Sequence, residues 1–123
     1  MSKILVVDDD QDILTLVKMA LTMNHFTVEA ISRWEEINDN LINFKPDLIL
    51  LDVSLNGADG RDICKKIKEA EDTKHIPVIL FSANAQMQTY VYDCGAATFI
   101  AKPFDLLHLL TTIRTHVNTF SGN

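Results

Sequence analysis

Short apolar runs alternate with segments of helical periodicity along the chain. The runs are rich in Val, Ile and Leu, which is typical of strands buried in a sheet; they cover residues 3–7, 26–30, 48–51, 77–81 and 98–101. Apolar residues three or four positions apart predict amphipathic helices in the other segments, over residues 10–23, 34–41, 63–67, 87–94 and 105–117. This alternation predicts an α/β fold in which a parallel sheet carries helices on both faces.

Three of the expected strands stop at charged residues. The first is followed by Asp8 and Asp9, the third by Asp52, and the fifth by Lys102. Because the ligand site of an open parallel sheet lies beyond the carboxyl ends of its strands, we expect these residues to meet at one edge. Clustered carboxylates repel one another unless a hard cation lies among them, and such oxygen donors suit Mg²⁺. The pattern therefore predicts a magnesium site.

Size and composition indicate a single domain. With 123 residues the chain can bury one hydrophobic core, and we expect the domain to cover residues 1–120, followed by a frayed tail at 121–123. No apolar stretch approaches the length of a membrane span and the first residues lack a signal-peptide layout, so we expect a cytoplasmic protein that does not bind membranes. The net charge of -6 argues against direct nucleic-acid binding by this domain.

The acidic run after the first strand also excludes one common class of ligand. Nucleotide and flavin phosphates bind there to loops rich in glycine or hydroxyl groups. Asp8, Asp9 and Asp10 would repel them instead. A metal-free anion site is therefore not expected at this position.

Five motifs occur in order on the expected elements, at residues 4–10 (ILVVDDD), 47–52 (DLILLD), 59–60 (DG), 82–83 (SA) and 102–104 (KPF). Through them the chain resembles the receiver domain of two-component response regulators over nearly its whole length. The resemblance implies a flavodoxin-like three-layer sandwich, with a five-stranded parallel sheet in the order 2-1-3-4-5 and five helices. It also implies a phosphoacceptor that is not itself a turnover enzyme and that signals by changing its protein contacts.

The resemblance assigns the central chemistry to four residues. Asp52 would be the phosphoacceptor, whose carboxylate attacks the phosphohistidine of a histidine kinase or a histidine phosphotransfer protein. Mg²⁺ would be bound directly by Asp9, by Asp52 and by the backbone carbonyl of Ser54, and through a water molecule by Asp8. Phosphoryl transfer passes through a loose transition state with spread negative charge, so positioned cations and donors are what the reaction needs.

The resemblance also implies a conformational switch. Ser82 would bond one phosphoryl oxygen and Lys102 another, with Ala83 in the same phosphate-binding group. Phe99 would turn inward as Ser82 moves, and an unknown downstream protein would bind the changed face at residues 86–117. The peptide bond between Lys102 and Pro103 would be cis, an isomer that X–Pro bonds adopt at low cost.

The chain departs from the family's usual pattern at several positions. Asn56 stands where proline is usual, so with Gly57 beside it we expect a looser loop after Asp52. The interval from Ser82 to Lys102 is short, which predicts a short or irregular fourth helix. Ser54 and Asn84 flank the site where side chains tune dephosphorylation in the family, and neither is charged.

Two other functions remain open on the sequence. One is an interaction module of the same fold that is no longer phosphorylated. The other is a Mg²⁺-dependent phosphohydrolase, against which stands Ser54 in the position where such enzymes place a general-acid aspartate. The sequence is compatible with a monomer or a weak dimer, and with a stand-alone regulator or a domain of a longer protein.

Overall fold

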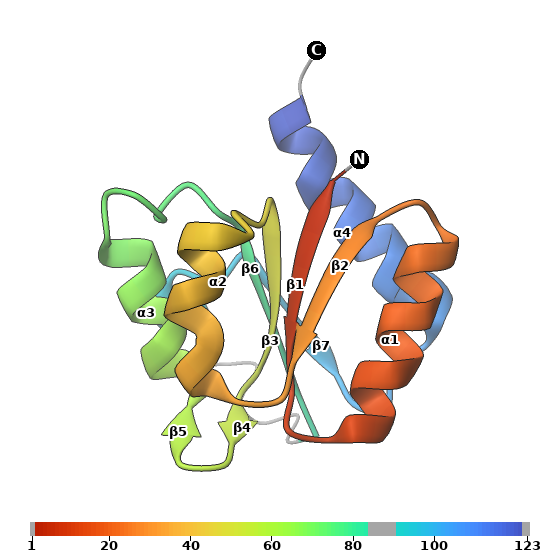
Figure 1. Cartoon of the computed structure of the whole chain (residues 1–123), viewed down its shortest axis with the longest axis horizontal. Helices are drawn as coiled ribbons and strands as arrows, with labels where there is room; N and C mark the ends of the chain where they lie inside the picture. Colours follow the sequence, from red (N-terminus) through yellow and green to blue (C-terminus); the bar gives the residue numbers. More distant parts are fainter. Residues whose placement is uncertain (1, 84–90, 122–123) are drawn as a thin grey trace.

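A five-stranded parallel sheet forms the centre of the protein (Figure 1). The computed structural model describes residues 2–83 and 91–121. The strands lie in the order β2-β1-β3-β6-β7, with bounds β1 (Lys3–Val7), β2 (Thr27–Ile31), β3 (Leu48–Asp52), β6 (Val78–Ser82) and β7 (Thr98–Ala101). Numbered among themselves, these strands have the expected order 2-1-3-4-5. Strands β3 and β6 are buried at every position, which explains why they are apolar apart from their last residues.

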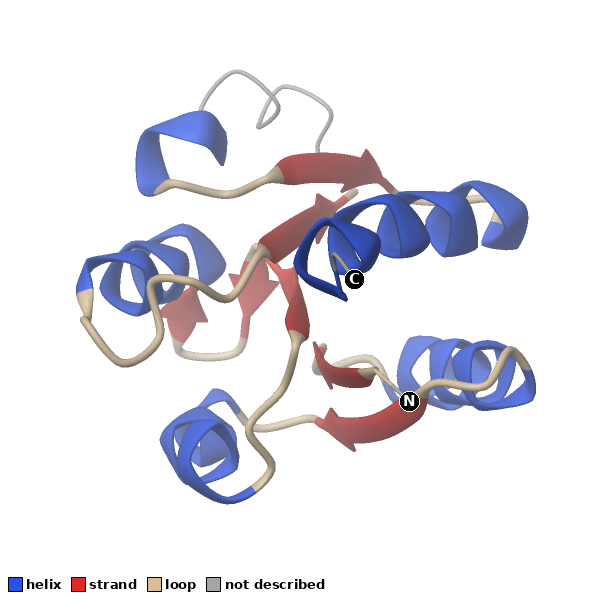
Figure 2. Ribbon diagram, turned by 90° about the horizontal axis from the view of Figure 1, so that it is seen from above, coloured by secondary structure: helices blue, strands red, loops and turns tan. Residues whose placement is uncertain are grey.

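Helices cover both faces of this sheet, which confirms the three-layer sandwich (Figure 2). Helices α1 (Gln11–Met23) and α4 (Leu106–Ser121) lie on one face, and α2 (Ile37–Asn43) and α3 (Gly60–Glu69) on the other. Successive residues of a strand point to opposite faces. Accordingly, Leu5 and Val7 belong to the core under α2 and α3, whereas Ile4 and Val6 belong to the core under α1 and α4.

The helix count differs from the expected five. The described residues contain four α-helices and the two 3₁₀ helices η1 (Trp34–Glu36) and η3 (Val91–Cys94). The expected helix at 87–94 is therefore represented by η3, while its earlier residues lie outside the described ranges. Gly95 follows η3 with φ 89°, the left-handed conformation that ends a helix.

A small hairpin that the sequence analysis did not predict follows β3. It consists of β4 (Ser54–Leu55) and β5 (Ala58–Asp59), which pair antiparallel. Asn56 and Gly57 form the connection, and Gly57 has φ 87°. Asn-Gly is the strongest short-range signal for a hairpin, so the sequence did carry this information. The segment expected to be a loose loop is thus a paired hairpin, and it lies at the carboxyl ends of the parallel strands (Figure 1).

Within residues 2–83 and 91–121, no helix is long and apolar enough to cross a membrane.

Candidate functional site

Adjacent strands bring the charged residues of the sequence motifs to one edge of the sheet. Asp8 directly follows β1, Asp52 ends β3, and Lys102 directly follows β7. The register pairs Val7 with Leu51, so the first two chain segments leave the sheet side by side. Parallel pairing of all five strands therefore converts three distant sequence positions into one site at the carboxyl edge.

Lys102 lies between two buried carboxylates. Its Nζ atom is 2.8 Å from Oδ2 of Asp8 and 3.3 Å from Oδ2 of Asp52. Asp8 is completely buried and Asp52 is 4% exposed. In addition, Lys102 Nζ lies 4.7 Å from the ring centroid of Phe81, where the negative face of the ring favours a cation. One ammonium group thus bridges the two buried acids.

Backbone donors hold the second oxygen of each buried carboxylate. The Asp10 amide donates to Oδ1 of Asp8 at 2.9 Å, and the Ser54 amide donates to Oδ1 of Asp52 at 3.2 Å. In each carboxylate, one oxygen therefore accepts a hydrogen bond from a backbone amide and the other faces Nζ of Lys102. This arrangement fixes the direction of both side chains relative to the sheet edge.

Burial and charge shift the ionisation of the site. Burial is the largest cause that raises the pKa of Asp52 to about 6, and the charge of Asp8 adds to it, while Lys102 and the Ser54 amide oppose the shift. Burial alone would lower the pKa of Lys102, but its contacts with Asp8 and Asp52 outweigh burial and raise that pKa. The carboxylates consequently keep a protonated cation beside them, and that single charge does not fully stabilise both.

Asp9 adds a third carboxylate to Asp8 and Asp52, and three carboxylates together can bind a cation. One oxygen each from Asp8, Asp9 and Asp52 can be chosen so that all three lie within 4.8 Å of one another. Asp9 is exposed, so the group is open to solvent on that side. Three carboxylates against one ammonium leave an excess of negative charge, and hard oxygen donors suit Mg²⁺. The residues present therefore fit a divalent cation.

The expected switch residues lie beside this group. Ser82 is the last residue of β6 and is 2% exposed, and the exposed Ala83 follows it. The Lys102 amide donates to the Ser82 carbonyl at 2.8 Å, and the peptide bond from Lys102 to Pro103 is cis. Phe99 lies in β7, partly buried against the core under α2 and α3. Asn84 lies outside the described residues.

Gly60 is a site residue whose role the sequence analysis missed. Its amide donates to the Val53 carbonyl at 2.7 Å. A Cβ atom at this position would lie 2.9 Å from Cα of Val53 and still closer to the carbonyl oxygen of Asp52. Only glycine therefore lets the start of α3 approach the backbone of the acidic residue. The sequence showed Gly60 as part of the motif at 59–60, but close approach to β3 depends on tertiary packing.

Residues 4–114 match the family model of the response regulator receiver domain. The chain belongs to this family. Members are signalling domains of two-component systems, and the parallel sheet with acidic residues at its carboxyl edge agrees with this assignment.

Individual relatives support the same assignment. The chain is 34% identical over 116 residues to the DNA-binding dual master transcriptional regulator RpaA of Synechocystis, covering 93% of this chain and 48% of RpaA. It is 33% identical over 116 residues to the response regulator ArlR of Staphylococcus aureus, covering 93% of this chain and 52% of ArlR. The receiver domain thus spans about half the length of these relatives.

A solved receiver domain has the same fold. The BeF3-activated N-terminal receiver domain of Klebsiella pneumoniae RstA superimposes with a TM-score of 0.84 at 27% identity, over 94% of this chain and 98% of that one. This similarity confirms the flavodoxin-like architecture that the sequence motifs implied.

Proposed function

We propose that Asp52 of this receiver domain accepts a phosphoryl group from a phosphohistidine, and that the modified domain relays the signal through altered protein contacts. The observation that carries the proposal is the bridge of Lys102 between Asp8 and Asp52 at the carboxyl edge of the sheet. Buried acids in this arrangement are unfavourable for stability alone, so a binding or chemical role accounts for them better. The donor would be a histidine kinase or a histidine phosphotransfer protein.

Asp52 is the nucleophile in this scheme. A carboxylate oxygen forms a bond to phosphorus while the bond between phosphorus and the donor's imidazole nitrogen breaks. The Ser54 amide holds Oδ1 of Asp52, which keeps the carboxylate oriented for attack. Lys102 stays beside the new acyl phosphate and pairs with a phosphoryl oxygen. This residue therefore has a partner both before and after the transfer.

Mg²⁺ would be held by Asp9, by Asp52 and by the Ser54 carbonyl, with Asp8 acting through a water molecule. Both oxygens of Asp8 already accept hydrogen bonds, from the Asp10 amide and from Lys102, which supports an indirect role for this residue. Bound Mg²⁺ supplies charge neutralisation for the phosphoryl oxygens and screens the repulsion between two anions. The protein residues supply orientation.

The output would follow from the neighbouring strands. Ser82 is buried at the end of β6, and Phe99 is only partly buried in β7, so a bond from Ser82 to the phosphoryl group could be accompanied by burial of this ring. The affected face at 86–117 includes described residues of η3, β7 and α4. The existence of a BeF3-activated RstA receiver domain supports an activation step of this kind in the present chain.

The two alternative functions make different predictions. A receiver-like interaction module would not need the excess negative charge that fits Mg²⁺. A phosphohydrolase would turn over external phosphoesters, but Ser54, the residue in the expected general-acid position, has a hydroxyl that does not act as an acid at neutral pH.

Intact mass spectrometry tests the proposal. The protein is incubated with Mg²⁺ and a small acyl-phosphate donor, and the expected result is a gain of one phosphoryl group that a chelator prevents. The gain should disappear in Asp52→Asn and decrease in Asp9→Asn. The exposed Asp72, in the loop between α3 and β6, provides a matched control, since Asp72→Asn should be phosphorylated like the wild type. Equal phosphorylation of Asp52→Asn would overturn the assignment.

A further inference from the structure

The β4–β5 hairpin is fixed firmly at its base. The Val53 amide donates to the Phe81 carbonyl at 3.0 Å, and the Gly60 amide donates to the Val53 carbonyl at 2.7 Å. At the other end, Asp59 caps helix α3 by accepting from the Arg61 amide at 2.8 Å. These bonds hold Val53 and Gly60, which flank the hairpin, and Asp59 at its end.

The tip of the hairpin has a different kind of support. Asn56 and Gly57 are exposed, and Gly57 adopts φ 87°, a left-handed conformation that glycine reaches without strain. A Cβ atom built on Gly57 would lie 3.5 Å from Nε1 of Trp34. Apart from the residues flanking Gly57, no other heavy atom of the described residues lies within 4 Å of that point. The indole edge of Trp34 is thus the neighbour of the tip.

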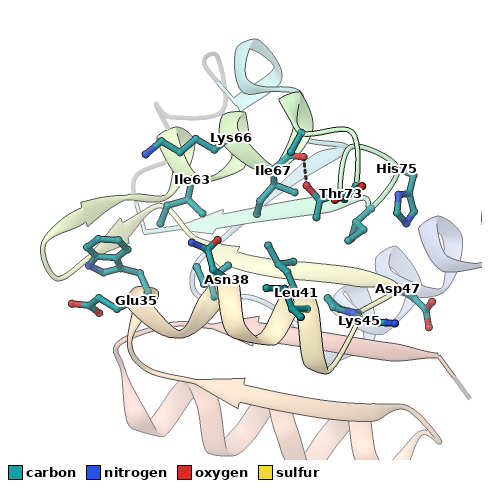
Figure 3. Close-up of a pocket in the computed structure, with 17 residues that line it drawn as sticks. Glu35, Asn38, Leu41, Lys45, Asp47, Ile63, Lys66, Ile67, Thr73 and His75 are labelled. Atoms are coloured by element: carbon teal, nitrogen blue, oxygen red, sulfur yellow. Dashed lines mark hydrogen bonds between the residues drawn. The ribbon is translucent and has the colours of Figure 1, made fainter.

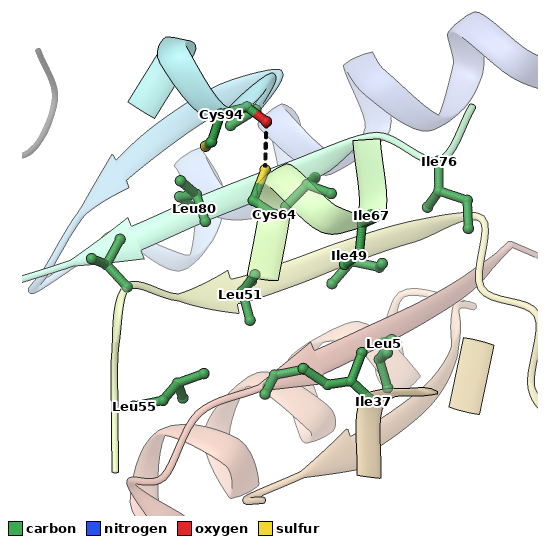
Figure 4. Close-up of a cluster of buried hydrophobic side chains, with 14 of the residues drawn as sticks. Leu5, Ile37, Ile49, Leu51, Leu55, Cys64, Ile67, Ile76, Leu80 and Cys94 are labelled. Carbon is green, nitrogen blue, oxygen red and sulfur yellow. Dashed lines mark hydrogen bonds between the residues drawn. The ribbon is translucent and has the colours of Figure 1, made fainter. Parts of the chain in front are cut away.

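Trp34 also packs against the core under α2 and α3. That core contains Leu51, Val53 and Leu55, which alternate with Asp52 and Ser54 along the same segment (Figure 4). Because alternate residues of an extended chain point to opposite sides, Asp52 and Ser54 face away from this core. Trp34 therefore packs against the core that lies behind the segment with the candidate metal ligands.

We propose that Trp34 is a positioning residue for the metal site: by bracing the tip of the β4–β5 hairpin, it holds the Ser54 carbonyl in the geometry that binds Mg²⁺. This inference rests on the proposed function. Groups that orient metal ligands affect affinity although they do not touch the metal. The hairpin begins two residues after Asp52, so a shift of its tip is transmitted to the Ser54 carbonyl over a very short stretch of backbone.

The position of Trp34 also makes the inference measurable. Trp34 lines a groove of about 1010 Å³ between α2 and α3, into which Leu41 and Ile67 point from opposite walls (Figure 3). Its ring is therefore only partly buried, and a smaller side chain can be accommodated without opening the centre of the core. It is also the single tryptophan of the chain, so the tryptophan fluorescence comes from this position beside the hairpin tip.

The first experiment is a fluorescence titration of the wild type with Mg²⁺, alongside calorimetry. The expected result is a change in Trp34 emission that saturates at the same Mg²⁺ concentration as the heat of binding. Asp9→Asn should weaken both signals together. Unchanged emission while calorimetry records binding would overturn the inference, and this result does not depend on the folding of any Trp34 variant.

The second experiment compares variants. Trp34→Ala should raise the Mg²⁺ concentration for half-maximal phosphorylation about tenfold, a loss typical of removing a group that orients metal ligands. The rate at saturating Mg²⁺ should stay close to that of the wild type. Trp34→Phe, which keeps a ring at the tip, should restore most of the affinity. Phe44→Ala is the matched control, since Phe44 is a partly buried aromatic residue of the same core at the other end of α2.

The outcomes distinguish a failure of the proposed function from a failure of the role of Trp34. A wild-type protein that neither binds Mg²⁺ nor becomes phosphorylated would overturn the proposed function and this inference together. A functional wild type with an unchanged half-saturation in Trp34→Ala, or with an equal loss in Phe44→Ala, would overturn only the role of Trp34.

Discussion

Two residues of the same strand, Leu50 and Asp52, show opposite uses of burial. Leu50 is 0% exposed and Asp52 is 4% exposed, so both are removed from water. Leu50 joins an apolar core, where burial stabilises the fold by about 25 cal/mol per Å² of apolar surface. Asp52 instead lies beside Asp8 and shares one ammonium group with it.

The difference shows where the fold tolerates instability. Removing charge from water costs free energy that a shared partner does not fully return, and the raised pKa of Asp52 reflects that cost. The middle of β3 stabilises the sheet, and its carboxyl end holds an unfavourable charge in place. A divalent cation at this end would relieve the repulsion, which couples binding to stability.

The largest expected effect is the difference in the free energy of unfolding between mutants of these two positions. Leu50→Ala leaves a cavity in the core and should lower the free energy of unfolding by about 2–5 kcal/mol. Asp52→Asn keeps the shape and the bond from the Ser54 amide but removes the repulsion from Asp8. In metal-free buffer at pH 7 it should raise the free energy of unfolding by about 1–3 kcal/mol. Denaturant titrations of both variants measure the two values, and a loss of stability in Asp52→Asn would contradict the comparison.

The sequence predicted the position of the acidic site because it depends on strand ends. Val, Ile and Leu runs that stop at Asp8, Asp52 and Lys102 can form a parallel sheet in only one direction, so their charges share an edge. The acidic edge therefore depends on local patterns that a single sequence carries. The strand order 2-1-3-4-5 came from the family resemblance instead.

Features that depend on packing between elements were not predictable in the same way. The requirement for glycine at Gly60 arises from the approach of α3 to β3, and the proximity of Trp34 to Gly57 brings together residues more than twenty positions apart. The fourth expected helix is described only at its end, where the 3₁₀ helix η3 is followed by the left-handed Gly95; residues 84–90 lie outside the described ranges. A 3₁₀ helix at this place agrees with the short or irregular helix that the short interval from Ser82 to Lys102 predicted.

The pH dependence of stability should also distinguish Asp52 from Leu50, because only Asp52 titrates. The pKa of Asp52 in the folded state, about 6, lies above the ordinary value of 3.8, so the folded state binds this proton more tightly. Without metal, protonated Asp52 stabilises the folded state fully below about pH 4, and this contribution is lost as the pH rises through about 6. The contribution to the free energy of unfolding is about 3 kcal/mol.

Unfolding of the wild type and Asp52→Asn at pH 4 and pH 7 measures this contribution as a difference. The wild type should lose more stability than the variant on raising the pH in metal-free buffer. In saturating Mg²⁺ the difference should shrink or reverse, because the metal binds the ionised carboxylate. Parallel curves for the two proteins without metal would exclude Asp52 as the titrating group.

The smallest expected effect concerns Asp59, an aspartate near the same edge with the opposite pKa shift. The hydrogen bond from the Arg61 side chain is the main cause that lowers the pKa of Asp59, and the carboxylate also caps α3. The ionised Asp59 carboxylate therefore stabilises the folded state above its ordinary pKa of 3.8, and this contribution is lost as the pH falls through the lowered pKa. Asp59→Ala should reduce the free energy of unfolding by about 1 kcal/mol at pH 7, as expected for a lost N-cap. Asp62→Ala, in the exposed first turn of α3, is the control and should cost less. If Asp59→Ala were instead stabilising like Asp52→Asn, proximity to the acidic edge would matter more than the partner of each carboxylate.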